Sequence, residues 1–293
     1  MLAPGAWAEF KFDGYRVSAA ADRDGVRLIS RHARSLTAAF PEVAAAVAVL
    51  AGGRTLLLDG EVVAPGAGGA PDFEALQSRA RTRASIPVQA RVPVRFIVFD
   101  LLHIEGRDLT GAPLGERRRL LEQLLHAPPA ALALSPTFVG AAPEQLLAIA
   151  AGHGLEGLVC KRAASLYQPG RRSRAWIKTV LAQSTEVTVI GCARGRARHP
   201  DGVGALLVAV LDQDGQLRYA GQVETGWTRD EHTELATALA RLAIDRCPLP
   251  NTSPPAVAGA RWALPELTGR VQFRHYTRAG LLRHPSWKGL LLR

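Results

Sequence analysis

Cysteine and long apolar runs are both scarce in this sequence, and their scarcity excludes several classes of protein. Only three cysteines occur, Cys160, Cys192 and Cys247, and no two of them form a CxxC pair. This pattern argues against a disulfide framework or a zinc site and is typical of a reducing compartment. No window approaches the roughly 18 uncharged apolar residues of a membrane span. The first ten residues lack a basic region followed by an apolar run, so no secretory signal is expected.

Lysine is also scarce. Among 36 basic residues only Lys11, Lys161, Lys178 and Lys288 are lysine, and the other 32 are arginine. Arginine stays protonated, whereas a lysine amine can act as a nucleophile where its surroundings lower its pKa. A chain this biased toward arginine, as from a GC-rich bacterial genome, is expected to keep lysine where arginine cannot serve. The alternative is that the four survive by chance.

The charge balance indicates the kind of partner. With 26 acidic residues the formal net charge is +10, which favours a polyanion such as nucleic acid. The length of 293 residues and an apolar content of 47% suit two domains with sizeable cores.

Strand-like and helix-like segments alternate through the first 180 or so residues. The expected fold class, α+β, is implied by the family resemblance described below. Apolar, β-branched runs predict strands, and an Ala-rich run opened by Pro41 and closed by Gly52 predicts a helix. The expected strands cover residues 8–22, 25–31, 55–65, 94–106, 155–162 and 174–180, and the expected helices cover 40–52, 76–81, 114–126 and 143–154.

After about Leu181 the pattern changes to short strands with glycine turns. Asp214-Gly215 is a hairpin signal, and one helix is expected from Arg229 to about Cys247. The strand-like segments cover residues 185–195, 204–226 and 271–285. Five or so strands with one helix indicate a small OB-type β-barrel. The expected domains are residues 1–182 and 183–293.

The segment from Lys11 to Arg16, KFDGYR, is the most informative motif. A lysine in a strand, then Asp13 and Gly14, places a nucleophile beside a turn where a phosphate can approach the backbone. An ordinary strand ending in an Asp-Gly turn is the alternative. The hexapeptide resembles the nucleotidyltransferase motif shared by DNA ligases, RNA ligases and mRNA capping enzymes. In that superfamily the lysine attacks the α-phosphate of a nucleotide and becomes a covalent lysyl–NMP.

The resemblance continues downstream in the family's order. It implies that Lys11 is the nucleophile and that an antiparallel, helix-packed nucleotidyltransferase domain precedes the barrel. The matching segments are Ser30-Arg31, LDGE at 58–61, FIVFD at 96–100, EGLVCK at 156–161 and WIK at 176–178. Three of the four lysines fall within these matches.

The resemblance also implies roles for the other site residues. It places Glu9, Arg16, Arg31, Glu61, Phe99, Lys161 and Lys178 against the nucleotide, with Phe99 stacking on the purine and Lys161 binding phosphate. Glu61 and Glu156 would hold Mg²⁺ or Mn²⁺, since phosphoryl transfer needs charge neutralisation and Mg²⁺ prefers oxygen ligands. Singly, each match has an ordinary alternative: a hairpin turn at 59–61, a surface ion pair between Glu156 and Lys161, or a core position for Phe99.

The second half resembles the OB domain of bacterial ATP-dependent ligases, most closely the LigD type used in nonhomologous end joining. The segments that carry this resemblance are GALL at 204–207, YAGQVETG at 219–226, LRHPSWKGL at 282–290 and YQPGRRS at 167–173. Lys288 is thereby expected to contact the ATP pyrophosphate. The arginine-rich stretches 171–174 and 194–198 would meet DNA phosphates, or form solvated loops.

These resemblances imply a cytoplasmic enzyme that seals 5′-phosphate/3′-OH nicks or ends. ATP is the expected cofactor, with AMP carried covalently on Lys11. Nicked or broken double-stranded DNA is the expected partner, with Ku and separate polymerase or nuclease end-processing proteins beside it. A monomer that associates with the nucleoid when on DNA, and with no membrane, is expected.

Three departures from the family pattern indicate weakened catalysis. Val180 stands where the family has a second lysine that touches the α-phosphate, and His32-Ala33 replace the family's Asn-Gly. The last motif also lacks the acidic and basic residues that commonly close it. A slow or pre-adenylylated ligase is expected, with two alternatives: a degenerate module that only binds or bridges DNA, and an RNA ligase or capping-type enzyme.

Overall fold

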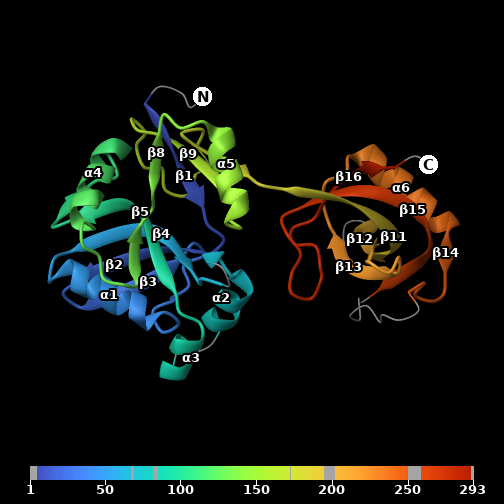
Figure 1. Ribbon diagram of the computed structural model, residues 1–293, viewed down its shortest axis with the longest axis horizontal. Helices are drawn as coiled ribbons and strands as arrows, with labels where there is room; N and C mark the ends of the chain where they lie inside the picture. Colours follow the sequence, from blue (N-terminus) through green and yellow to red (C-terminus); the bar gives the residue numbers. More distant parts are fainter. Residues whose placement is uncertain are drawn as a thin grey trace. The chain divides into compact units, whose positions relative to one another are not determined.

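The computed structural model describes residues 5–66, 69–81, 85–171, 173–194, 202–249 and 259–291 (Figure 1). The chain divides into two compact units, residues 1–181 and 182–293. In the described ranges no helix is long and apolar enough to cross a membrane. The arrangement confirms the predicted α+β class, with antiparallel sheets and a few packed helices.

A six-stranded sheet forms the larger part of the first unit. Its strands are β2 (Tyr15–Asp22), β3 (Gly25–Ser30), β4 (Leu56–Val63), β5 (Arg95–Ile104), β6 (Arg107–Asp108) and β7 (Leu132–Leu134). The order is β3-β2-β4-β5-β6, with β7 parallel to β5. Alternate residues such as Val17, Ala19, Leu58 and Val98 are fully buried in one core. The other face of these strands is therefore free to carry polar groups.

Helices cover the apolar face of this sheet and its edges. The helix α1 (Pro41–Ala51) adds Val43, Val47 and Leu50 to the same core. Helices α2 (Phe73–Ala80) and α4 (Leu114–Leu124) add Leu76 and Leu121. The short α3 (Ile86–Arg91) was not predicted.

A four-stranded antiparallel sheet completes the first unit. Its order is β10-β9-β1-β8, formed by β1 (Ala6–Lys11), β8 (Thr137–Val139), β9 (Gly157–Arg162) and β10 (Trp176–Val180). Ala8 and Leu158 on one face pack with Leu146 of helix α5 (Pro143–Gly152). The predicted strand 8–22 is therefore wrong in one respect: it breaks at Phe12–Gly14, where the chain passes from this sheet into the six-stranded one.

The second unit is a curved six-stranded sheet with one helix (Figure 1). Its strands are β11 (Gln183–Arg194), β12 (Val203–Leu211), β13 (Leu217–Val223), β14 (Ala243–Ile244), β15 (Ala260–Phe273) and β16 (Ser286–Leu290). Trp287 is fully buried against Gly269, where any side chain would collide with the indole. This half-barrel is consistent with the predicted OB fold.

Local features of the second unit confirm one prediction and correct two. The Asp214-Gly215 hairpin joins β12 to β13, with Gly215 at φ 73°. The helix α6 (Arg229–Arg241) begins with a capping box between Thr228 and Glu231, but it ends at Arg241 and not near Cys247. Pairing of β14 with β15 takes the next residues out of the helix. The predicted strand 271–285 ends at Phe273, and a loop follows.

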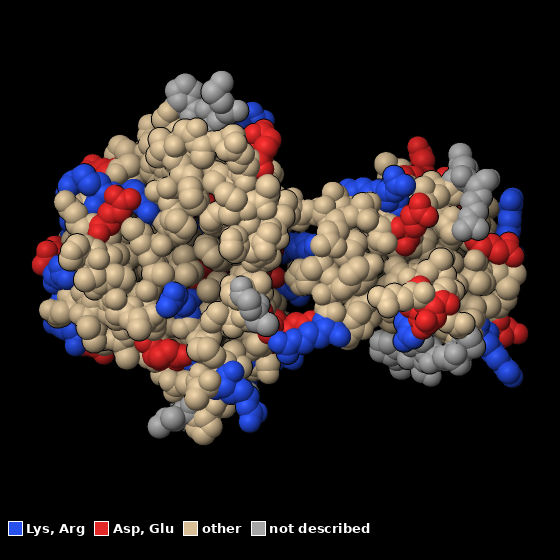
Figure 2. All heavy atoms as spheres, in the orientation of Figure 1, with Lys and Arg blue, Asp and Glu red and all other residues tan. Residues whose placement is uncertain are grey.

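Both charge signs occur on the surface of each unit. Figure 2 shows Lys and Arg side chains interspersed with Asp and Glu over the visible face of each. The excess of positive charge is therefore not gathered into one continuous patch on that face.

Candidate active site

Lys11 ends β1, on the face of the four-stranded sheet that α5 does not cover. It lies opposite Gly157 of β9, which lies opposite Val180 of β10. Gly157 has φ 137°, and a Cβ there would collide with the Thr179 carbonyl oxygen. Glycine at 157 is therefore needed for this close approach of β9 and β10.

The register puts the predicted cations on one face. Directly paired residues in neighbouring antiparallel strands project to the same side of a sheet. Glu9 and Lys11 of β1 therefore share a face with Lys161 of β9 and with Trp176 and Lys178 of β10. The opposite face carries Ala8, Leu158 and the other apolar residues that pack on α5. Three of the four lysines thus stand on one surface.

The six-stranded sheet supplies the second wall of the site. The Lys161 ammonium lies 4.5 Å from the centroid of the Phe99 ring on β5 and 4.2 Å from that of Trp176. The two rings meet edge to face with centroids 5.9 Å apart. The Arg16 guanidinium lies 5.6 Å from the centroid of Phe99 on another side. Phe99 is only half-buried, so the core alternative for this residue is wrong.

Lys11 has a carboxylate partner. Its ammonium pairs with Glu156, and the Glu156 backbone N–H donates to the Lys11 carbonyl at 2.9 Å. The exposed fraction is 19% for the Lys11 side chain and 6% for that of Glu156. The Lys11 side chain is thus partly accessible, with a carboxylate beside its ammonium.

Glu9 is held by three donors in a buried position. Trp7 Nε1 donates to Oε1 at 2.9 Å, Ser135 Oγ donates to Oε2 at 2.8 Å, and Lys161 Nζ lies 2.8 Å from Oε1. Both Glu9 and Lys161 are only 2% exposed, so the surface ion pair between Glu156 and Lys161 considered from the sequence is wrong. A carboxylate with these donors is an acceptor only, which suits recognition of a donor group on a ligand.

Two arginine–carboxylate pairs fix the strands that carry the second wall. Arg16 binds Asp59 in a bidentate pair of 3.1 and 2.6 Å, and Tyr167 also donates to Asp59 at 3.0 Å. Arg117 binds Asp100, next to Phe99, through two bonds of 2.8 Å with both side chains fully buried. Such forked pairs set geometry as well as charge.

The electrostatics of the site follow from its burial. Burial lowers the pKa of Lys161, an effect opposed by Glu9. Burial raises the pKa of Glu61 to about 8, although the nearby charges of Lys178 and Arg16 oppose the shift. Burial also raises the pKa of Asp100 against the effect of Arg117, and it raises that of Tyr167 to about 12. Perturbed groups gathered in one place are typical of a functional site.

The carboxylates suit a divalent cation that is bound together with phosphate. Within the described ranges no group of three or more His, Cys, Asp or Glu side chains forms a ready-made metal site. Mg²⁺ is commonly held by one or two carboxylates plus phosphate oxygens. Glu61, whose raised pKa reflects burial without full compensation, and Glu156 fit this pattern.

The structure brings most of the predicted residues together. The residues that lie in strands of the two facing sheets of the first unit are Glu9, Lys11, Arg16, Glu61, Phe99, Lys161 and Lys178, and Glu156 directly precedes β9. Residues 59–61 lie within β4, so the hairpin alternative for them is wrong. Arg31 is exposed just after β3, and Lys288 is exposed on β16 of the second unit.

Sequence reasoning missed the residues that position these groups. They are Trp7, Asp59, Ser135, Tyr167 and Arg117. Ser135 lies 126 residues from Glu9, and no local pattern marks such a contact. Of the arginine-rich stretches, residues 172 and 195–198 lie outside the described residues.

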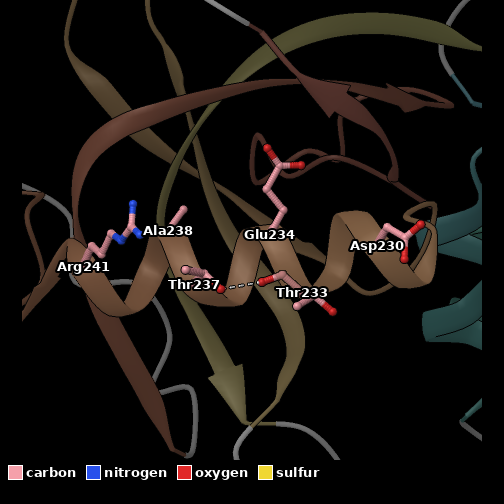
Figure 3. A pocket seen from close by; sticks show the side chains of 6 residues that line it. All are labelled: Asp230, Thr233, Glu234, Thr237, Ala238 and Arg241. Atoms are coloured by element: carbon pink, nitrogen blue, oxygen red, sulfur yellow. Dashed lines mark hydrogen bonds between the residues drawn. The ribbon is translucent and has the colours of Figure 1, made fainter.

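A surface hollow in the second unit does not belong to this site. It is lined by six residues of α6 alone, Asp230, Thr233, Glu234, Thr237, Ala238 and Arg241 (Figure 3). A hollow along a single helix is open to solvent, and none of the predicted site residues lines it.

Facing sheets that present a lysine amine, further cations, carboxylates and an aromatic ring suit a site of the nucleotidyl-transfer class. Comparison with known proteins then identifies the family. Residues 1–179 match the family model described as ATP dependent DNA ligase domain, and residues 199–291 match ATP dependent DNA ligase C terminal region. The chain belongs to the ATP-dependent DNA ligase family.

Two relatives and one solved structure show which kind of ATP-dependent ligase the chain resembles. The chain is 37% identical to the multifunctional non-homologous end joining DNA repair protein LigD of Mycobacterium tuberculosis, over 97% of the chain and 36% of the relative. It is 34% identical to LigD of Pseudomonas aeruginosa, over 98% of the chain and 34% of the relative. The solved structure of mycobacterial DNA ligase D complexed with ATP and MES matches with a TM-score of 0.58 and 35% identity, over 99% of this chain and 90% of that one. The chain thus spans about a third of the LigD proteins, in the part that carries the ligase fold.

Proposed function

We propose that this chain is an ATP-dependent DNA ligase core whose Lys11 carries AMP. The observation that supports it most is the placement of three of the four lysines on one sheet face, opposite Phe99 and Glu61. Chance retention of lysine in an arginine-rich chain does not account for this convergence. The ATP bound in the mycobacterial relative is consistent with the same nucleotide here.

The proposed reaction has three steps. The Lys11 amine attacks the α-phosphorus of ATP, a P–N bond forms and pyrophosphate leaves. The 5′-phosphate of DNA then attacks the same phosphorus, which frees Lys11 and gives AMP–DNA. The 3′-OH finally attacks the 5′-phosphate, the phosphodiester bond forms and AMP leaves.

Residues of the first unit would have different roles in the attack of Lys11 on ATP. Glu156, which pairs with Lys11, would accept the ammonium proton, or a cation bound to Glu156 would favour loss of that proton to solvent; either route gives the neutral amine that attacks. Lys178 stands close enough to Glu61 to influence its pKa, and with Lys161 it would neutralise phosphate oxygens. A divalent cation held by Glu61 and Glu156 would add charge neutralisation at the phosphates. Phe99 would stack on the base, and Lys288 would act on the pyrophosphate.

The choice of nucleotide separates a DNA ligase from a capping-type enzyme. Glu9 is an acceptor that can bind the amino group of adenine, and the ATP bound in the mycobacterial relative favours the same base here. We expect label from α-labelled ATP and not from GTP, followed by sealing of nicked DNA. Label from GTP, or sealing confined to RNA, would favour the capping-type or RNA ligase alternative. DNA binding without label or sealing would favour the degenerate module.

The wider biological role is a proposal by analogy with the LigD relatives. Their names support a role in non-homologous end joining. We further propose that the chain acts on nicks or double-strand breaks in the cytoplasm. Ku and separate polymerase or nuclease proteins are the proposed partners. We propose that the chain acts as a monomer.

The raised pKa of Glu61 gives a pH-dependent requirement for metal. Below about pH 8 Glu61 is mostly protonated, so a cation must displace a proton to bind it. We expect the Mg²⁺ or Mn²⁺ concentration for half-maximal labelling of Lys11 to fall about tenfold for each pH unit up to about 8, and then to level off. The protonated form also stabilises the fold relative to the ionised form, a contribution that is present at low pH and lost as pH rises through about 8.

Glu61→Gln supplies the control for this prediction. Because the amide does not titrate, its metal midpoint should not change with pH. If the variant is too slow to label, direct Mn²⁺ titration of both proteins with bound ATP gives the same comparison. A wild-type midpoint that does not move between pH 6 and 8 would contradict the assignment of Glu61.

A further inference from the structure

The C-terminal part of the second unit is rich in positive charge and contains no acid. From Leu267 to the end of the chain there is no Asp or Glu, whereas Arg270, Arg274, Arg278, Arg283 and Lys288 are positive. The acids that pair with arginines come from elsewhere in the unit, as Asp212 pairs with Arg218 and Glu186 with Arg270. The segment therefore differs in charge from the rest of its own domain.

Within it, residues 274–285 form a loop that projects between β15 and β16 (Figure 1). We call this loop the arginine-rich loop. Its two arms are joined by backbone hydrogen bonds from Arg274 to Arg283 and from Arg283 to His275, both 3.0 Å. An isolated β-bridge joins Tyr276 to Leu282, and the Leu282 N–H donates to Ala220 of β13 at 2.8 Å. The loop is thus anchored to the barrel.

The tip of the loop is a tight turn with an exposed arginine. The Gly280 N–H donates to the Thr277 carbonyl at 2.9 Å, and Gly280 has φ 74°. The Leu281 N–H donates to the Thr277 hydroxyl at 3.1 Å. Arg278 and Ala279 are the central residues of this turn, and both are exposed. Because the turn is hydrogen-bonded, little backbone entropy remains to be lost when Arg278 meets a ligand.

An exposed aromatic ring accompanies the charges. Tyr276 is 42% exposed, yet its ring rests edge to face on Phe273 with centroids 4.8 Å apart. An aromatic side chain between arginines is typical of surfaces that bind nucleic acid, where the ring contacts bases or sugars and the arginines contact phosphates.

We propose that the arginine-rich loop binds the DNA backbone beside the strand break. Arg278 would contact a phosphate, and Tyr276 would contact an adjacent sugar or base. The inference rests on the proposed function for the identity of the substrate. The hydrogen bonds that shape the loop join residues of the second unit.

Arg278→Ala tests the phosphate contact, and Arg229→Ala is the matched control. Arg229 is an exposed arginine of the same unit that begins α6 beside Asp230 and Glu231. Binding of the full chain to a nicked duplex is measured over a series of salt concentrations. Loss of one phosphate contact should weaken binding by about three- to tenfold at low salt and reduce the log–log salt slope by about 0.9. Arg229→Ala should leave both unchanged.

Tyr276→Ala and Tyr276→Phe test the ring. The alanine variant should weaken binding about tenfold with an unchanged salt slope, and phenylalanine should restore it. Equal salt slopes for wild type, Arg278→Ala and Arg229→Ala would overturn the inference. Labelling of Lys11 by ATP needs no DNA. Normal labelling together with equal salt slopes for DNA binding would therefore reject only the proposed role of the loop. Absent labelling in the wild type rejects the proposed function instead.

Discussion

Replacing Lys11 with alanine is expected to abolish the covalent AMP adduct and to slow sealing of an ordinary nick by at least about a thousandfold. Lys11 ends β1 with its side chain partly accessible beside Glu156, and the remaining lysines of that face stand on other strands. A neighbouring lysine cannot take its place without moving a paired strand. The two measurements are adduct formation with labelled ATP and single-turnover sealing.

Lys11→Arg separates nucleophilicity from charge. Arginine keeps the positive charge opposite Glu156 but cannot attack phosphorus, so this variant should fail like alanine. Both variants should still join a nick that already carries AMP on its 5′-phosphate, within about tenfold of wild type, because that step does not use the amine as a nucleophile. Adduct formation by Lys11→Arg would contradict the role given to Lys11.

Replacing Arg117 with alanine is expected to give the largest loss of stability. Arg117 forms a forked pair with Asp100 in which both side chains are fully buried, and it also donates to the Ala112 carbonyl at 2.6 Å. Removal of one partner leaves a buried carboxyl uncompensated, which typically costs about 3–5 kcal/mol. For a unit of this size the melting temperature should fall by about 10 °C.

Arg107→Ala is the matched control for this experiment. Arg107 pairs with Glu116 at 2.7 Å, but 61% of the arginine side chain is exposed. Exposed pairs contribute about 0–1 kcal/mol, so the melting temperature should change little. Because Asp100 follows Phe99, the Arg117 variant should also weaken nucleotide binding at temperatures where it remains folded. Equal melting temperatures for the two variants would show that the buried pair is not needed for the fold.

The positions of the site residues along the strands were predictable because the signal is local. Strand-like runs around Lys11, Glu61, Lys161 and Lys178 were expected, and all four residues lie in strands. Which side chains touch was not predictable. Lys161 was expected on a phosphate, and in the structure it pairs with Glu9 between two aromatic rings.

The errors in the predicted strand 8–22 and in the predicted end of α6 have the same physical origin. The segment 8–22 is strand-like throughout, yet Gly14 packs so tightly on β4 that a side chain would collide with the Val62 carbonyl. Local propensity contains no information about this change of sheet. Likewise, α6 ends at Arg241 because Ala243 and Ile244 pair with a strand some twenty residues later in the chain. In both places tertiary pairing overrides a local preference.

The most direct test of the account is to map the adduct. The purified chain is incubated with ATP and Mg²⁺ or Mn²⁺, and its intact mass and proteolytic peptides are measured under conditions that preserve a P–N bond. The account predicts one added AMP per chain, on Lys11, discharged when nicked DNA is supplied. AMP on another residue, or no adduct after pre-bound AMP has been excluded by mass, would contradict it.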